Sequence, residues 1–178
     1  MDFYALLNFA TEVGYQLQMS GAEIYRVEES VQRLLAAYGA PTGEVFAIPN
    51  CLNVSVAGPE TGKPLTRIRR VGPHGTDISR LEALNQLCRD LEANPVPLEE
   101  AEARFQSILS EKVEYSFLAR LGAYALGASA FALFFKGDLR DAFCGMICGI
   151  IVGLSLHYTE QHKANSFFKV FIVNAEVL

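Results

Sequence analysis

The chain lacks the short motifs of nucleotide-dependent and metal-dependent enzymes. None of the patterns GxxxxGK[ST], GxGxxG or HExxH occurs in its 178 residues, so ATP-driven, dinucleotide-dependent and zinc-protease chemistries have no support. The cysteines form neither a CxxC pair nor a zinc-binding pattern; they are Cys51, Cys88, Cys144 and Cys148. We therefore expect no metal and no cofactor, and a reduced cytosolic setting for the first part of the chain.

The first two thirds of the chain also lack a surplus of basic residues. Up to Glu114 the chain carries ten Lys or Arg against sixteen Asp or Glu, a net charge of −6. From Tyr115 on, five basic and four acidic residues give a net charge of +1. Phosphate binding needs a basic face, so we expect no nucleic acid as a partner. The shift predicts a first domain over 1–114 and a membrane region over 115–178.

A signal peptide is absent from the N-terminus. The segment MDFYALLNFATEV has no basic residues before its apolar positions, and polar residues interrupt those positions. We therefore place the first domain in the cytoplasm.

The stretch from Ser20 to Gly39 has the pattern of one helix. Ser20 followed by Glu23 matches a capping box, in which each residue caps the other's backbone. Apolar residues then recur at three- and four-residue steps as far as Tyr38. Gly39 stands where a C′ glycine ends a helix, with Pro41 just beyond it.

Strand patterns follow this helix. Within residues 44–57, Leu52, Val54 and Val56 alternate with Asn53 and Ser55, which suits a half-buried strand. Pro49 and Asn50 suggest a break or bulge between two short strands. Residues 65–71 return as a strand, and a hairpin with the preceding strand is expected.

Three further apolar stripes predict helices around these strands. They lie between Phe3 and Leu17, between Ile78 and Leu91, and from Pro97 to Leu109. The first part therefore reads α-α-β-β-α-α, and the fold class is an α+β cytosolic domain followed by transmembrane α-helices.

Two long apolar runs predict membrane spans at about 116–135 and 142–159, joined by the charged loop 136–141. A third apolar run, 165–178, is incomplete as a span. The second span carries Gly145, Gly149 and Gly153 at four-residue steps, a close-packing face for a neighbouring helix. The numbers of basic residues near the spans do not decide their orientation.

Arg67 and Arg69 alternate along the strand 65–71 and therefore project to the same face. Two guanidinium groups on one face can hold a carboxylate in bidentate fashion. The alternative is an exposed basic strand that pairs with the many acidic side chains of the domain. Both interpretations stay open.

The motif SGAEIYRVEE at Ser20–Glu29, the strand patterns and the pair Arg70-Val71 resemble the threonine/serine exporter family, specifically the longer subunit of its split exporters. The family usually has Thr where Ile24 stands. Members normally have about five helices in this half, whereas two spans and the incomplete run are visible here. A capped, solvated helix is the alternative interpretation of the motif.

The resemblance implies a subunit of a secondary active exporter in the inner cell membrane, driven by an ion gradient. Its substrates would be threonine and serine, or a dicarboxylate such as succinate. A second membrane subunit would complete the transporter, and a homo-oligomer is a further option. The substrate-binding residues expected are Ser20, Glu23, Arg26, Glu28, Arg67 and Arg69.

Two other functions are compatible with the sequence. One is a membrane-tethered hydrolase-like enzyme, for which Cys51 and His74 are the available nucleophile and base, although no third orienting group is visible. The other is a membrane adaptor that does not transport. No catalytic residue is assigned, and we expect that the protein is not an enzyme.

Overall fold

The computed structural model describes residues 2–57, 64–111 and 115–161, and the chain divides into two compact units, Met1–Val113 and Glu114–Leu178. The first unit is built in the order α1 (Phe3–Met19), α2 (Ile24–Ala37), β1 (Glu44–Ile48), β2 (Cys51–Ala57), β3 (Pro64–Arg70), α3 (Ile78–Ala93) and α4 (Leu98–Ser110). The second unit contains α5 (Phe117–Phe134) and α6 (Leu139–Gln161). The structure therefore confirms the prediction of a small unit with both helices and strands, followed by two long apolar helices.

The order α-α-β-β-α-α is wrong in one respect, because the sheet has three strands. Pro49 and Asn50 form a two-residue turn, and Ile48 pairs with Cys51 across it, so β1 and β2 make a tight antiparallel hairpin. A proline has no backbone N–H and favours a turn conformation. The interruption at Pro49 is thus a hairpin turn and separates two full strands. β3 pairs with β2, also antiparallel, which gives the strand order β1-β2-β3.

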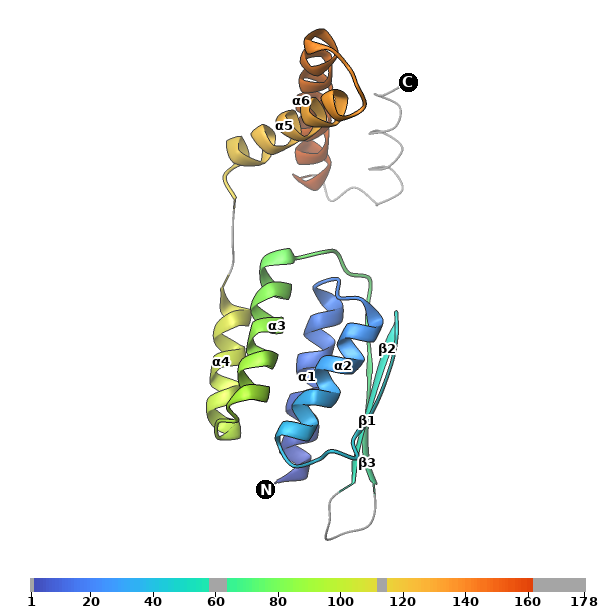
Figure 1. Cartoon of the computed structure of the whole chain (residues 1–178), viewed down its shortest axis with the longest axis vertical. Coiled ribbons are helices and arrows are strands. Elements are labelled where there is room, and N and C mark those ends of the chain that lie inside the picture. The colour runs from blue at the N-terminus through green and yellow to red at the C-terminus, as the bar shows by residue number, and fades with distance from the viewer. Residues whose placement is uncertain (1, 58–63, 112–114, 162–178) are drawn as a thin grey trace. The chain divides into compact units, whose positions relative to one another are not determined.

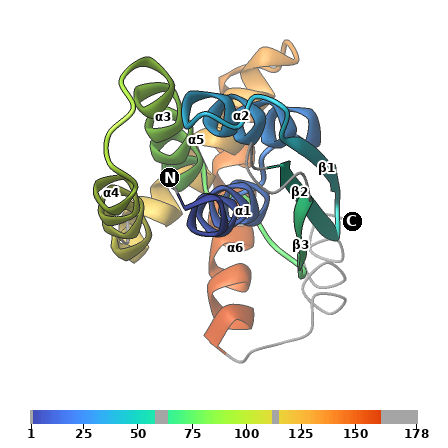
Figure 2. The same ribbon diagram turned by 90° about the horizontal axis from the view of Figure 1, so that it is seen from below.

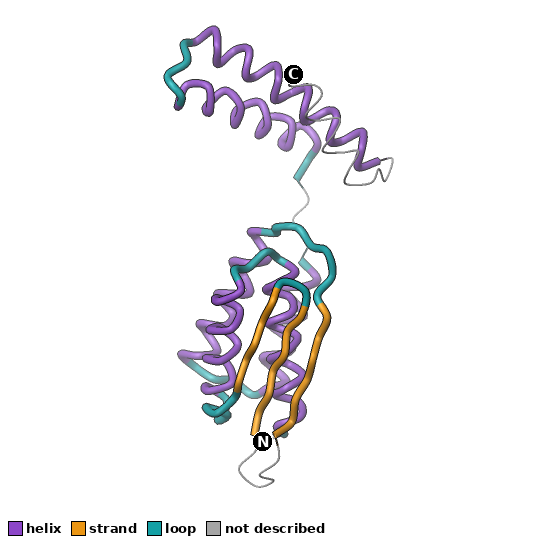
Figure 3. Tube along the Cα trace, turned by 90° about the vertical axis from the view of Figure 1, so that its right-hand side faces the viewer, coloured by secondary structure: helices purple, strands orange, loops and turns teal. Residues whose placement is uncertain are grey.

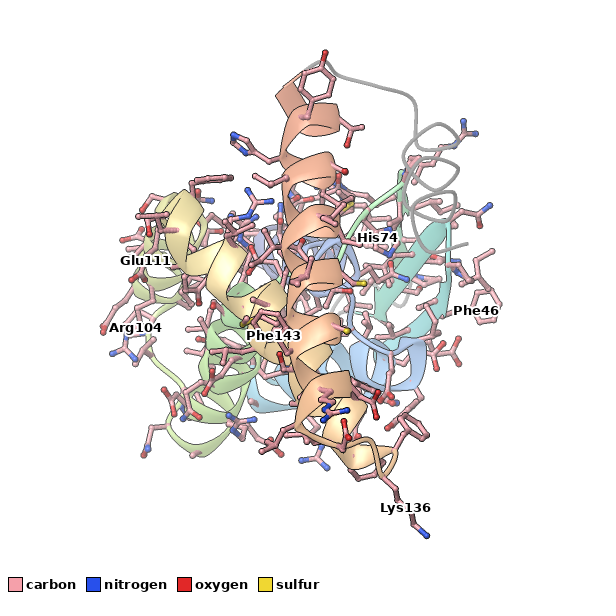
Figure 4. The ribbon with its side chains drawn as sticks, turned by 90° about the horizontal axis from the view of Figure 1, so that it is seen from above. Phe46, His74, Arg104, Glu111, Lys136 and Phe143 are labelled. Atoms are coloured by element: carbon pink, nitrogen blue, oxygen red, sulfur yellow. The ribbon has the colours of Figure 1, made fainter. Side chains whose placement is uncertain are left out.

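The first unit has three layers: the sheet, then α1 with α2, then α3 with α4 (Figures 1 and 2). α1 and α2 cover one face of the sheet, and α3 packs on both of them. Figure 3 shows the strands side by side, with the helices behind them. On the outer face, Phe46 and Ile68 are 62% and 69% exposed, and the Phe46 ring projects away from the sheet (Figure 4).

The expected capping box at Ser20 is wrong, because Ser20 ends α1 instead of starting α2. Gly21 adopts a φ of +86°, and its N–H donates to the carbonyl of Gln18 at 2.9 Å. This left-handed residue closes α1 and reverses the chain, as C′ glycines do. Ser20 is 1% exposed, and its carbonyl accepts from Asp77 N–H at 3.1 Å. Glu23 is the N-cap of α2, and its side chain makes no cap hydrogen bond.

The predicted end of α2 at Gly39 is confirmed. Gly39 has a φ of +80°, and its N–H donates to the carbonyl of Ala36 at 3.1 Å. The N–H of Ala40 donates to the carbonyl of Leu35 at 2.9 Å. These two hydrogen bonds make a Schellman motif, which satisfies carbonyls that the helix itself leaves unpaired.

The core of the first unit depends on a close approach between α1 and its neighbours. A Cβ atom added at Gly14 would lie 2.8 Å from side-chain carbons of both Leu52 and Val31, so glycine allows α1 to pack tightly on α2 and β2. On the other side of α1, the rings of Phe9 and Phe105 meet edge to face, with centroids 5.9 Å apart. Each helix layer is therefore joined to α1 by buried apolar contacts.

We expect residues 1–113 to fold without the rest of the chain and to unfold in one cooperative thermal transition, because their core is self-contained. Phe105 is 2% exposed, so Phe105→Ala should cost this fragment about 3–5 kcal/mol. Phe46→Ala, at an exposed position, is the matched control and should change stability by less than about 0.5 kcal/mol. Chemical denaturation followed by circular dichroism measures both. A fragment without a cooperative transition would contradict the prediction.

The second unit is a helical hairpin. α5 and α6 pack along each other, and Lys136, with a φ of 66°, stands in the turn between them (Figure 4). The predicted loop 136–141 is shorter than expected, because α6 begins at Leu139. The Asp138 carboxylate accepts from the N–H groups of Arg140 at 2.8 Å and Asp141 at 3.0 Å. Asp138 is thus the N-cap of α6, and the charged residues Arg140 and Asp141 belong to the first turn of the helix.

Both helices of this unit are long and apolar enough to cross a membrane. Phe117–Phe134 has a mean hydropathy of 1.5 and Leu139–Thr159 of 1.7, and only 0% and 11% of these spans are buried in the structure. Their apolar side chains therefore face outward, unlike those of a soluble core helix. The third run predicted at 165–178 lies outside the described residues.

Candidate functional site

The register of the sheet determines where the two arginines of β3 point. Arg67 pairs with Val54, and Arg69 pairs with Leu52. Val54 and Leu52 are both fully buried beneath α1 and α2. Because directly opposite residues share a face of the sheet, Arg67 and Arg69 project to the helix side. Arg70 projects to the outer face.

Three residues of α1 meet these arginines. Arg67 Nη1 donates a hydrogen bond to Asn8 Oδ1, and Arg69 Nη1 forms an ion pair with Glu12 Oε2. The Arg69 guanidinium also lies over the Tyr15 ring, 4.0 Å from its centroid, in a cation–π contact. We call these five residues the α1–β3 polar cluster.

The cluster is half-buried and carries more positive than negative charge. The side chains of Arg69 and Glu12 are 32% and 27% exposed, so water screens their pair less than it screens a surface pair. Glu12 Oε1 also accepts from Gln16 Nε2 at 3.2 Å. The hydrogen-bond acceptor of Arg67 is the neutral amide of Asn8, and no carboxylate of residues 2–57, 64–111 or 115–161 pairs with Arg67. Two cations beside one anion can therefore accept a further carboxylate.

The α1 half of the cluster was not predicted from the sequence. Asn8, Glu12 and Tyr15 follow one another at steps of four and three residues and so share one face of α1. A polar row on a helix is usually solvated, so the row alone does not indicate a site. A signal was nevertheless present, because an edge strand with two inward-facing arginines requires polar partners on the helix that covers it.

The motif Ser20–Glu28 does not join this cluster. Arg26 pairs with Glu23 at 2.9 Å, with both side chains 61% exposed. The interaction with Tyr25, chiefly the hydrogen bond to its hydroxyl, and to a smaller extent the charge of Glu23 raise the pKa of Arg26 above its usual value. Glu23 and Arg26 are therefore a surface ion pair at the start of α2, and the buried Ser20 stands at the end of α1.

Glu28 caps the opposite edge of the sheet. Its Oε1 accepts a hydrogen bond from the backbone N–H of Ala47 in β1 at 2.8 Å. β1 and β3 are the two edge strands, so Glu28 and the two arginines are separated by the width of the sheet. A carboxylate bound to an edge N–H group also blocks strand addition at that edge.

The cysteines described in the structure are all free thiols. Burial raises the pKa of Cys88 to about 12, so this thiol stays protonated and unreactive at neutral pH. Cys51 lies in β2, whereas His74 lies in the segment after β3 and its Nδ1 is 2.9 Å from the carbonyl oxygen of Gly72. No hydrogen bond joins Cys51 to His74 in the described part of the chain.

The three glycines of α6 face α5 at very short range. A Cβ atom at Gly149 would lie 2.4 Å from the carbonyl oxygen of Tyr124, and one at Gly145 would lie 3.0 Å from that of Ala128. At Gly153 it would lie 2.9 Å from the Tyr124 ring. The two helix backbones therefore approach as closely as small-residue faces allow.

Comparison with known proteins assigns the family. A family described as "Putative threonine/serine exporter" matches residues 8–175. Pheromone-regulated membrane protein 10 of Debaryomyces hansenii is 26% identical over 163 residues, which cover 91% of this chain and 16% of that protein. The threonine/serine exporter of Corynebacterium glutamicum is 22% identical over 165 residues, covering 92% of this chain and 34% of that protein. No solved structure matches the chain.

The chain thus spans about a sixth and about a third of the lengths of these two relatives. The family match itself extends from α1 through both candidate membrane helices. On the strength of that match, the chain belongs to the threonine/serine exporter family.

Proposed function

We propose that the chain is one subunit of a secondary active exporter of small polar metabolites that carry a carboxylate. The first unit lies in the cytoplasm, and α5 and α6 cross the inner cell membrane. Family membership supports export, and the Corynebacterium glutamicum relative is named a threonine/serine exporter. The two apolar helices support the membrane location. Threonine and serine are the substrates proposed first, with a dicarboxylate such as succinate as the alternative.

The observation that best supports the proposal is the excess of positive charge in the α1–β3 polar cluster, which has two arginines and one glutamate. A half-buried arginine whose partner is a neutral amide is a costly arrangement in a stable domain. It becomes useful when an anionic group binds, because the planar guanidinium matches a carboxylate with two parallel hydrogen bonds. Arg67 is therefore the proposed carboxylate contact, and Arg69 supports it from the same face.

A second membrane subunit is part of the proposal. The described residues include two candidate spans, α5 and α6, and a solute path needs several helices with inward-facing polar groups. Substrate contacts by Ser20, Glu23, Arg26 and Glu28 stay a prediction. The hydrolase alternative gains no supporting contact, since no hydrogen bond joins Cys51 to His74 among the described residues. The adaptor alternative stays a prediction.

Export measurements on arginine variants test the proposal. In cells loaded with labelled threonine, Arg67→Gln should lower the export rate about tenfold or more, because a charge-assisted hydrogen bond contributes about 1.5–3 kcal/mol. Arg69→Gln should also lower the rate, through the lost pairing with Glu12. Arg70→Gln is the matched control, since Arg70 lies on the same strand but on its exposed outer face. All rates are normalised to the amount of protein in the membrane. Unchanged export in both Arg67→Gln and Arg69→Gln would contradict the proposal.

A further inference from the structure

We propose that Glu12 is the specificity-determining residue of the α1–β3 polar cluster and selects an α-amino acid zwitterion over a dicarboxylate. In this arrangement Arg67 binds the carboxylate of the ligand and Glu12 accepts a hydrogen bond from its ammonium group. The inference rests on the function proposed above and names the substrate class of the same site.

The charges of the cluster favour a ligand that carries both an anionic and a cationic group. Arg67 is hydrogen-bonded to the neutral Asn8, so a ligand carboxylate there meets a cation whose charge no described carboxylate offsets. Glu12 lies four residues after Asn8, which places it about 6 Å further along the axis of α1. An α-amino acid carries an ammonium group and a carboxylate on the same carbon atom, so it can satisfy both positions at once. A dicarboxylate would bring its second negative charge towards Glu12 and be repelled.

The contacts around Arg69 hold Glu12 in position and leave it able to accept another hydrogen bond. Arg69 pairs with Glu12 and lies 4.0 Å from the Tyr15 centroid, so its guanidinium is held between a carboxylate and an aromatic face. These contacts keep Arg69 in place as a positioning residue for Glu12. An ionised carboxylate has about four acceptor sites. Glu12 uses one oxygen for Arg69 and the other for Gln16, which leaves room for a donor from the ligand.

Access to the cluster follows from the topology. β3 is an edge strand, and among the described elements it contacts only β2 and α1. Arg69 and Glu12 remain 32% and 27% exposed. The cluster is thus shielded from most of the solvent, which strengthens charge recognition, but it is still accessible to a small solute.

Equilibrium binding to the purified full-length chain in mild detergent tests the inference. The probes are labelled L-threonine, labelled succinate, and 2,3-dihydroxybutyrate, in which a neutral hydroxyl replaces the ammonium group of threonine. The wild-type chain should bind threonine in preference to both other probes. Glu12→Gln should weaken threonine binding about tenfold or more without weakening succinate binding. Arg67→Gln should weaken both.

Two further variants separate specificity from folding. Glu12→Asp keeps the charge and should restore part of the preference for threonine, whereas Glu102→Gln, at an exposed position of α4, should change nothing. Thermal unfolding of each variant checks that the chain still folds. An unchanged ratio of threonine to succinate affinity in Glu12→Gln would overturn the inference, and so would a wild-type chain that binds no threonine. Threonine binding with the expected ratio, but without export from cells, would instead contradict only the proposed function.

Discussion

Replacing Gly149 with leucine is expected to separate α5 from α6. A Cβ atom at this position would lie 2.4 Å from the carbonyl oxygen and 2.9 Å from the carbonyl carbon of Tyr124. Both are backbone atoms, which cannot rotate aside as a side chain can. Overpacking typically costs about 1–3 kcal/mol, and a leucine against a helix backbone should exceed that range. Gly149→Ala should already weaken the hairpin, and Gly149→Leu should abolish it.

The measurement is the thermal stability of the purified chain in mild detergent, together with its level in the membrane. Gly127→Leu is the matched control, because no atom lies within 4 Å of a Cβ added at Gly127 in α5. The expected result is a large loss of stability for Gly149→Leu and little change for Gly127→Leu. If the two leucine variants melt alike, the close packing of α6 on α5 does not stabilise the protein.

We also expect that the 178-residue polypeptide alone gives no saturable flux of substrate across a membrane. The close approach at Gly145 and Gly149 leaves no room for a solute between α5 and α6. The hydroxyl of Ser129 is hydrogen-bonded to the carbonyl of Ala125 in its own helix, at 2.8 Å. The hydrocarbon core solvates no polar groups, so a path for a polar solute needs inward-facing polar groups that α5 and α6 do not supply to each other. We propose that a second membrane subunit supplies them. The third apolar run, 165–178, contains the polar residues Asn174 and Glu176, which lie outside the described residues.

Liposomes reconstituted with the purified chain, with and without a co-expressed second membrane subunit, provide the measurement. An imposed gradient and labelled threonine or succinate report efflux. Flux should appear only when the second subunit is present, and Arg67→Gln should then reduce it. Saturable efflux from the chain alone would show that its own helices, singly or as an oligomer, form a pathway.

Local patterns in the sequence predicted most of the helices and strands, because the apolar periods of 3.6 and 2 depend on neighbouring residues alone. The end of α2 at Gly39 was predictable for the same reason. The start of that helix was not. A serine before a glycine can cap the helix that follows or end the helix that precedes, and the positive φ of Gly21 decides between these outcomes. At Pro49 the sequence indicated a break or bulge, and the pairing of Ile48 with Cys51 shows a hairpin turn.

The sequence alone determined that Arg67 and Arg69 share a face, since alternation along a strand requires it. It also placed Gly145, Gly149 and Gly153 on one face of a helix. Only the tertiary structure decided what those faces meet. Asn8 and Glu12 are almost sixty residues from their arginine partners in the chain, and their pairing depends on how α1 lies across the sheet. Contacts between distant segments arise from the packing of whole elements, whereas the pattern of a single element is set by its own residues.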